Sequence, residues 1–102
     1  MNPEIKERWI AALRSGKYAQ KKHKLRGYEG FCCLGVLVDI EDPDGWIEIS
    51  PNLYKYKNLF STLPQEMLDS CGIDLRTQEV LIKMNDKGAS FEKIASWIQD
   101  NL

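Results

Sequence analysis

The chain has 102 residues, 43% of them hydrophobic, and a formal net charge of −1, which suits one domain with a single modest core. Its longest apolar run has eleven residues, whereas a bilayer span takes about 20, so we expect no membrane segment. The N-terminus lacks the apolar stretch of a signal peptide, and three cysteines, two of them adjacent, fit a reducing cytosol better than a disulfide framework.

The charge is distributed unevenly along the chain. Residues 1–26 carry eight Lys or Arg and two Glu, a net charge of +6, whereas residues 27–102 carry six Lys or Arg and thirteen Asp or Glu, a net charge of −7. Such asymmetry indicates either a basic binding face or two parts that attract each other. Both interpretations stay open on the sequence alone.

The first element is a predicted helix that begins at Pro3, with Asn2 as its cap, and ends before Gly16. Its apolar residues recur at helical spacing and define a buried stripe. They are Ile5, Trp9, Ile10 and Leu13.

A basic segment follows at residues 17–28, which we expect to form two short strands, near 18–20 and 24–26, or an ordered loop. Clustered lysine and arginine suit phosphate groups, and tyrosines can stack on a base, although no glycine-rich phosphate loop is present. The candidate ligand-binding residues are Lys17, Tyr18, Lys21, Lys22, His23, Lys24, Arg26 and Tyr28.

The apolar run at residues 30–40 is the element around which the chain is organised. Its spacing favours a helix over residues 32–40, although Val36 and Val38 would also suit a strand. In either case we expect its apolar side chains to be buried. The expected core residues are Cys33, Leu34 and Leu37.

A turn and a hairpin are predicted next. Pro43 and Gly45 indicate the turn, and residues 46–49 and 53–56 alternate in the manner of two strands around residues 50–52. We expect this hairpin to display three aromatic side chains as secondary binding candidates. They are Trp46, Tyr54 and Tyr56.

The remaining chain reads as helical. We expect a two-turn helix from about residue 62 to its stop at Gly72, a helix over residues 78–84 capped by Thr77, and a last helix over residues 91–101 capped by Ser90. Together the elements predict a single α+β domain, residues 1–102, with about four helices packed against a short antiparallel hairpin.

Three chemical interpretations lack the residues or the spacing that they need. Zinc sites pair their ligands as C-x2–4-C, whereas two of the three cysteines here are adjacent. A cysteine nucleophile with His23 as base lacks a third, orienting group. A calcium loop with Gly45 at position 6 would place Ile40 and Pro51 where carboxylates are needed. We therefore expect no metal, no cofactor and no catalytic residue.

Several short motifs of the chain form a recognisable set. They are Trp9 with Ala12-Leu13-Arg14-Ser15-Gly16 and Tyr18, Cys32-Cys33-Leu34-Gly35-Val36-Leu37, Leu63-Pro64, Asn85-Asp86-Lys87-Gly88, Ser90-Phe91 and Ile94-Ala95. In these motifs the chain resembles a family of small uncharacterised proteins encoded by tailed bacteriophages. The resemblance implies a protein that acts in the host cell cytoplasm, where small phage accessory proteins often block host enzymes or defence systems.

The expected function is therefore that of a non-catalytic accessory protein that binds and neutralises a host component. A phosphate-bearing small molecule, such as a nucleotide immune signal, would suit the basic segment, and a host protein would suit either charged face. The alternative is a nucleic-acid-binding module that uses residues 17–26. An enzyme is the third hypothesis. The sequence leaves the oligomeric state open.

Overall fold

The apolar run folds as a helix, α2 (Cys33–Glu41), in the computed structural model, which describes residues 1–102. Its residues 33–38 are all buried, so protein encloses this part of the helix. The thiol of Cys32 caps the helix and accepts the N–H of Gly35 at 3.4 Å. The helix predicted for residues 32–40 is thus confirmed, with each end displaced by one residue.

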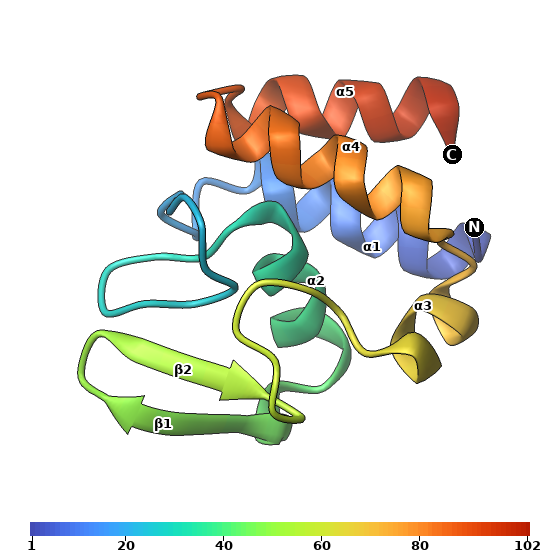
Figure 1. The fold of residues 1–102 in the computed structure, drawn as a ribbon. Coiled ribbons are helices and arrows are strands. Elements are labelled where there is room, and N and C mark those ends of the chain that lie inside the picture. The colour runs from blue at the N-terminus through green and yellow to red at the C-terminus, as the bar shows by residue number, and fades with distance from the viewer.

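Three longer helices pack together above α2 in Figure 1. Helix α1 (Pro3–Arg14) lies along α5 (Phe91–Asn101), and α1 and α4 (Leu75–Asp86) both contact α2. The buried indole of Trp9 donates from Nε1 to the carbonyl oxygen of Cys33 at 2.9 Å, which joins α1 to α2. The hydrophobic core therefore gathers around the apolar run.

Side-chain caps at the first and last helices agree with the sequence. The side chain of Asn2 accepts the N–H groups of Glu4 and Ile5 at 2.9 and 3.1 Å, and Gly16 follows α1 with a φ of +75°. At α5, Ser90 accepts the N–H of Lys93 at 3.2 Å. Both predicted helices are confirmed.

The middle helices differ in detail from the prediction. Helix α3 (Gln65–Cys71) begins after Pro64, and Gly72 ends it in the left-handed conformation with a φ of 74°. Helix α4 begins earlier than expected, because Asp74 caps it by accepting the N–H of Thr77 at 2.7 Å. Thr77 therefore lies inside the helix and is not its cap. The chain has five α-helices, where about four were predicted.

The predicted hairpin is confirmed and lies at the opposite side of α2 from α5 (Figure 1). A 3-10 turn, Pro43–Gly45, leads into β1 (Trp46–Ser50), which pairs antiparallel with β2 (Leu53–Tyr56) in the only sheet. The pairing places Glu48 opposite Tyr54 and is interrupted before Ser50. The fold is therefore α+β, with helices dominant.

The long connection between α1 and α2 forms no strand, so of the two predicted alternatives the ordered loop is correct. Gln20 and Arg26 each make an isolated bridge to Phe31, and no longer ladder develops. None of the helices has the length and apolar character needed to cross a bilayer.

Candidate functional site

The predicted binding segment lies in this loop, residues 17–31, which we name the basic loop. Leu25 anchors its middle: the side chain is fully buried, and its N–H donates to the carbonyl oxygen of Phe60 at 2.7 Å. The carbonyl oxygen of Leu25 accepts the N–H of Cys32 at 3.1 Å and packs against Gly35. Because Gly35 has no side chain, the loop backbone can lie directly on α2.

A buried asparagine on α4 fastens the basic loop to the core. Asn85 is 1% exposed, and its Oδ1 accepts from Nε2 of Gln20 at 2.9 Å and from the N–H of Cys33 at 3.2 Å. Its Nδ2 donates to the carbonyl oxygen of Lys21 at 2.8 Å. One amide thus joins α4, the loop and the start of α2, which satisfies polar groups that would be costly to bury unpaired.

The neighbouring Asp86 holds the loop at His23. One carboxylate oxygen accepts the backbone N–H of His23 at 2.8 Å, and the other lies 3.3 Å from its ring Nδ1. Ser61 donates from Oγ to the carbonyl oxygen of His23 at 2.9 Å. These contacts hold His23 at a φ of 71°. This conformation costs a non-glycine residue free energy, and it persists because the surrounding contacts offset the cost.

His23 is the only basic side chain of the loop with a carboxylate partner. Helix α1 instead pairs both of its arginines with glutamates of α2 and α5, at 2.9 and 3.1 Å. The ion pairs between the basic and acidic parts of the sequence are thus made mainly by α1. The loop cations with no carboxylate oxygen within 4.0 Å are Lys17, Lys21, Lys22, Lys24 and Arg26.

Arg26 differs from the lysines because aromatic rings surround it. Its guanidinium carbon lies 4.0 Å from the ring centre of Tyr54, 5.1 Å from that of Phe31 and 5.5 Å from that of Trp46. Such cation–π contacts are stabilising, and here they join the basic loop to the hairpin. Substitution of Arg26 would remove packing as well as charge.

Tyr18, predicted as a stacking residue, is half-buried and makes contacts within the protein. Its hydroxyl donates to Asp39 at 2.7 Å, and its ring meets Phe31 edge-on with 5.1 Å between ring centres. Burial, reinforced by the hydrogen bond to Asp39, raises the pKa of Tyr18 to about 12. The other oxygen of Asp39 accepts from the indole Nε1 of Trp46 at 3.1 Å. Tyr18 therefore serves the packing of loop on α2.

The secondary aromatic candidates are also engaged in internal contacts. Tyr56 is only 3% exposed and donates to Asp42 at 2.7 Å, so the expectation that the hairpin displays it is wrong. Burial and the bond to Asp42 raise the pKa of its hydroxyl. Trp46 and Tyr54 are half-buried, and Tyr54 donates to Glu48 at 3.1 Å. The strand alternation predicted the hairpin but not which face packs inward.

The structure brings two predicted residues together in an open hollow of about 450 Å³, which we name the Lys21–Tyr28 hollow. Glu29 and Asn52 complete its lining. Asn52 comes from the hairpin tip, 24 residues along the chain from Tyr28, and its Oδ1 accepts the N–H of Tyr28 at 3.2 Å. Sequence analysis missed Asn52, because nothing in its local pattern signals this distant contact.

Other predicted residues line two separate hollows. One, of about 240 Å³, includes His23, Lys24 and Cys32, and the other, of about 340 Å³, includes Lys17 and Tyr18. Lys22 points elsewhere: its amino group lies 3.9 Å from the position of a β-carbon on Gly88. The candidate residues thus form a spread basic surface and not one pocket.

All three cysteines are buried and free. Burial raises the pKa of the Cys32 thiol to about 11 and that of Cys33 well above its usual range, so both are protonated at neutral pH. The ring of His23 is paired with Asp86, and no hydrogen bond joins it to Cys32. No cluster of three or more His, Cys, Asp or Glu side chains is placed to hold a metal ion.

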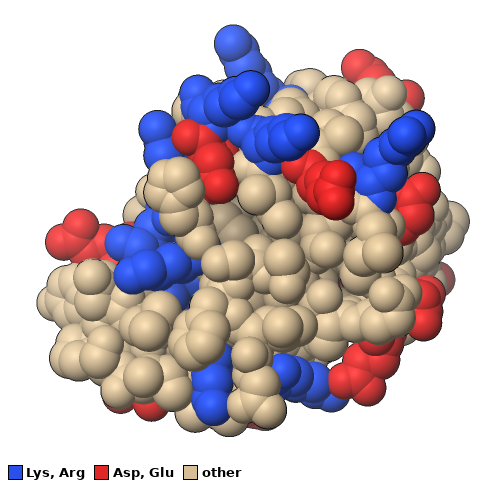
Figure 2. Space-filling view, viewed as in Figure 1, with Lys and Arg blue, Asp and Glu red and all other residues tan.

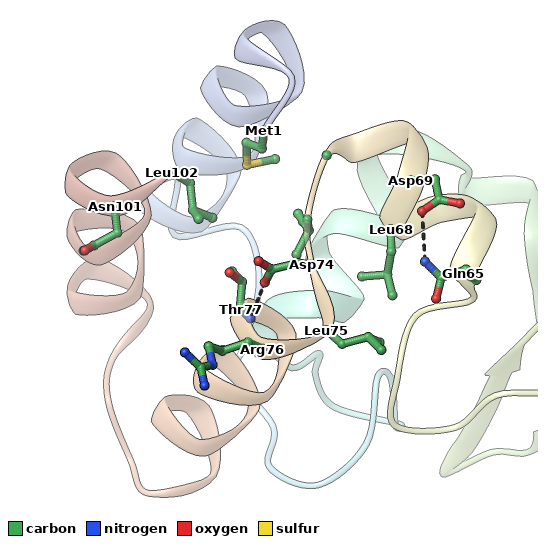
Figure 3. Close-up of a pocket in the computed structure, with 12 residues that line it drawn as sticks. Met1, Gln65, Leu68, Asp69, Asp74, Leu75, Arg76, Thr77, Asn101 and Leu102 are labelled. Carbon is green, nitrogen blue, oxygen red and sulfur yellow. Dashed lines mark hydrogen bonds between the residues drawn. The ribbon is translucent and has the colours of Figure 1, made fainter.

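The largest hollow of the molecule, about 1000 Å³, contains none of the predicted site residues (Figure 3). It is lined by α3, the start of α4 and both chain ends. Its carboxylates have partners: Asp69 accepts from Gln65 at 2.9 Å, and Asp74 accepts the N–H of Thr77 at 2.7 Å. These two acidic side chains outnumber the single basic one, Arg76, so the side chains that line this hollow suit an anion poorly.

The basic surface extends beyond the segment that the sequence singled out. Figure 2 shows Lys and Arg side chains gathered at the upper left, over the basic loop and the adjoining ends of α4 and α5. Lys83 and Lys87 are four residues apart near the end of α4, so they share its face beside Asp86. Their separation in sequence from the basic loop hid this association.

Comparison with known proteins gives a family but no described relative. Neither the curated proteins nor the solved structures include a match to this chain. One family matches residues 1–102, and its description is "Domain of unknown function (DUF8296)". The match spans the basic loop, the apolar run and the α4 residues that join them. The chain therefore belongs to the DUF8296 family.

Proposed function

We propose that this protein is a non-catalytic binding protein that uses the basic loop to hold an anionic, phosphate-bearing ligand. The observation that carries the proposal is the set of five loop cations without carboxylate partners. Like charges this close repel one another. A bound polyanion would relieve that repulsion, and an internal carboxylate does not.

The attachment of the loop to α4 supports the same proposal. Asn85 and Asp86 fix the backbone at Lys21 and His23, so the loop does not have to be ordered when a ligand arrives. Binding to a surface that is already ordered avoids part of the entropy cost of association.

The biological setting we propose follows the resemblance to phage proteins. In the cytoplasm of an infected bacterium, a protein of this kind would act as an accessory factor that neutralises a host component. A nucleotide immune signal fits the basic loop. A host protein with an acidic face would fit the wider basic surface.

A second candidate is a nucleic-acid-binding module. Lys17, Lys21 and Lys24 line three different hollows, and further lysines follow at the end of α4. This spread suits an extended polyanion better than a compact one. Affinity for a single strand would then fall steeply with salt, because each neutralised phosphate releases counterions.

The test is titration with two probes, inorganic tripolyphosphate and a single-stranded oligonucleotide of fifteen thymidines, at low and moderate salt. We expect Lys21→Glu combined with Lys22→Glu to weaken binding of the preferred probe about tenfold or more, which corresponds to about 1.4 kcal/mol. The melting temperature should fall only slightly, because Lys22 is exposed and the half-buried Lys21 has no carboxylate partner to lose.

Arg76→Glu is the matched control for the single variants Lys21→Glu and Lys22→Glu, since each of the three reverses one positive charge and Arg76 lies in the hollow of Figure 3. Preference for tripolyphosphate supports a small ligand, and a stronger, salt-sensitive preference for the oligonucleotide supports the second candidate. Absence of binding for both probes, or equal losses in loop and control variants, contradicts the proposal.

A further inference from the structure

The turn at residues 27–30 presents Tyr28 in a way that no other tyrosine of the chain is presented. The hydroxyls of Tyr18, Tyr54 and Tyr56 all donate to carboxylates, whereas Tyr28 has no such partner and is 72% exposed. An exposed aromatic ring gains nothing from the core. It offers a face on which a flat ligand can stack.

The turn beneath Tyr28 is ordered on both sides. The N–H of Gly27 donates to the carbonyl oxygen of Gly30 at 2.9 Å, and the N–H of Tyr28 donates to Asn52 at 3.2 Å. The side chain of Lys21 lies across Gly27, where a β-carbon would come within 2.5 Å of its Cε. The tyrosine and the lysine are therefore held next to each other.

The lining of the Lys21–Tyr28 hollow offers a distinct chemistry at each residue. Lys21 has no carboxylate partner and provides a positive charge for a phosphate. Asn52 uses Oδ1 for the turn, which leaves its two amide N–H donors for a ligand. Glu29 supplies acceptors for hydroxyl or amino groups.

We infer that the Lys21–Tyr28 hollow binds a nucleotide 5′-monophosphate, with the base stacked on Tyr28 and the phosphate on Lys21. The inference rests on the proposed function, because it names the ligand class and the place on the same basic loop. A volume of about 450 Å³ is in the range of sites for such ligands. In this assignment the amide of Asn52 supplies donors, and the carboxylate of Glu29 supplies acceptors, for polar groups of the base or ribose.

The experiment measures affinity for AMP, adenosine and inorganic phosphate on the whole chain. We expect AMP to bind more tightly than either fragment, since only AMP engages both Tyr28 and Lys21. Tyr28→Ala should weaken AMP about tenfold, the loss expected when one stacking ring is removed, and should leave phosphate binding unchanged. Tyr28→Phe should keep the affinity for AMP, because the ring remains. Lys21→Gln should weaken both AMP and phosphate.

Two results overturn the inference. One is AMP affinity no greater than that of inorganic phosphate, and the other is a Tyr28→Ala variant that binds AMP as well as the parent chain. Binding of tripolyphosphate in the same preparation distinguishes failure of the nucleotide assignment from failure of the proposed function. If tripolyphosphate still binds, the basic loop binds anions and only the nucleotide assignment fails. If no anion binds, the proposed function fails with it. The melting temperature of each variant checks that the fold is retained.

Discussion

At Gly35 the carbonyl oxygen of Leu25 occupies the space in which a β-carbon would lie. Two residues earlier, the carbonyl oxygen of Cys33 accepts the indole N–H of Trp9. The Cys-Cys-Leu-Gly-Val-Leu motif of residues 32–37 is thus explained by packing. They seat the basic loop and α1 on α2, and no reactive role is needed to account for them.

The Gly35→Ala substitution tests this contact through the sign of its effect. Helix propensity alone predicts that alanine stabilises a helical position by up to about 1 kcal/mol relative to glycine. Overlap with the backbone of Leu25 predicts the opposite, a loss of about 1–3 kcal/mol or more, as in overpacked cores. We expect a loss of unfolding free energy in urea titrations. A gain in stability would show that loop and helix are not in contact there.

Most residues with local signals were predicted correctly, Thr77 being the exception, whereas the roles of residues that depend on distant partners were not predicted. The roles of Asn2, Ser90 and the apolar side chains of α2 can be predicted from the residues next to them in the sequence. Arg26 looks like any other cation of the segment, yet it packs among three rings from α2's entry and from the hairpin. The function of such a residue depends on which elements meet, and the sequence pattern does not specify that.

At the scale of elements, α4 decides the conformation of the basic loop. Asn85 and Asp86 bond to Gln20, Lys21 and His23, which lie 63 or more residues away in the sequence. Residues 85–88 were correctly expected to end a helix. Nothing in that local pattern predicts their second role, the bonds to the basic loop. Likewise Thr77 resembled a cap, whereas the preceding Asp74 caps α4.

We expect Asn85→Ala to destabilise the protein strongly. The substitution leaves the N–H of Cys33 and the carbonyl oxygen of Lys21 without their partner, and each such group costs about 1–3 kcal/mol when it stays buried. Hydrogen exchange at the Cys33 amide should also accelerate relative to the core of α5. Asn101→Ala is the control, because that exposed side chain bonds only within its own helix. Equal stability of the two variants would rule out Asn85 as the fastener of the loop.

At the scale of the whole molecule, the uneven charge of the sequence is resolved into two separate features. The arginines of α1 are paired with glutamates of α2 and α5, whereas the lysines of the basic loop have no carboxylate partner. Lys and Arg side chains gather over the same end of the fold in Figure 2. The largest hollow lies elsewhere and carries acidic side chains (Figure 3). This distribution of charge is the reason why we propose that an anion binds at the end of the fold that carries the basic loop.

The central claim is that the basic loop is the anion-binding surface, and backbone amide shift mapping tests it most directly. A 15N-labelled sample would be titrated with inorganic tripolyphosphate and followed by amide correlation spectra. We predict saturable shifts at residues 17–31, at Asn52 and at residues 85–88, with little change at α3 or at the chain ends. Shifts concentrated around the hollow of Figure 3, or no shifts at millimolar tripolyphosphate, would contradict the claim.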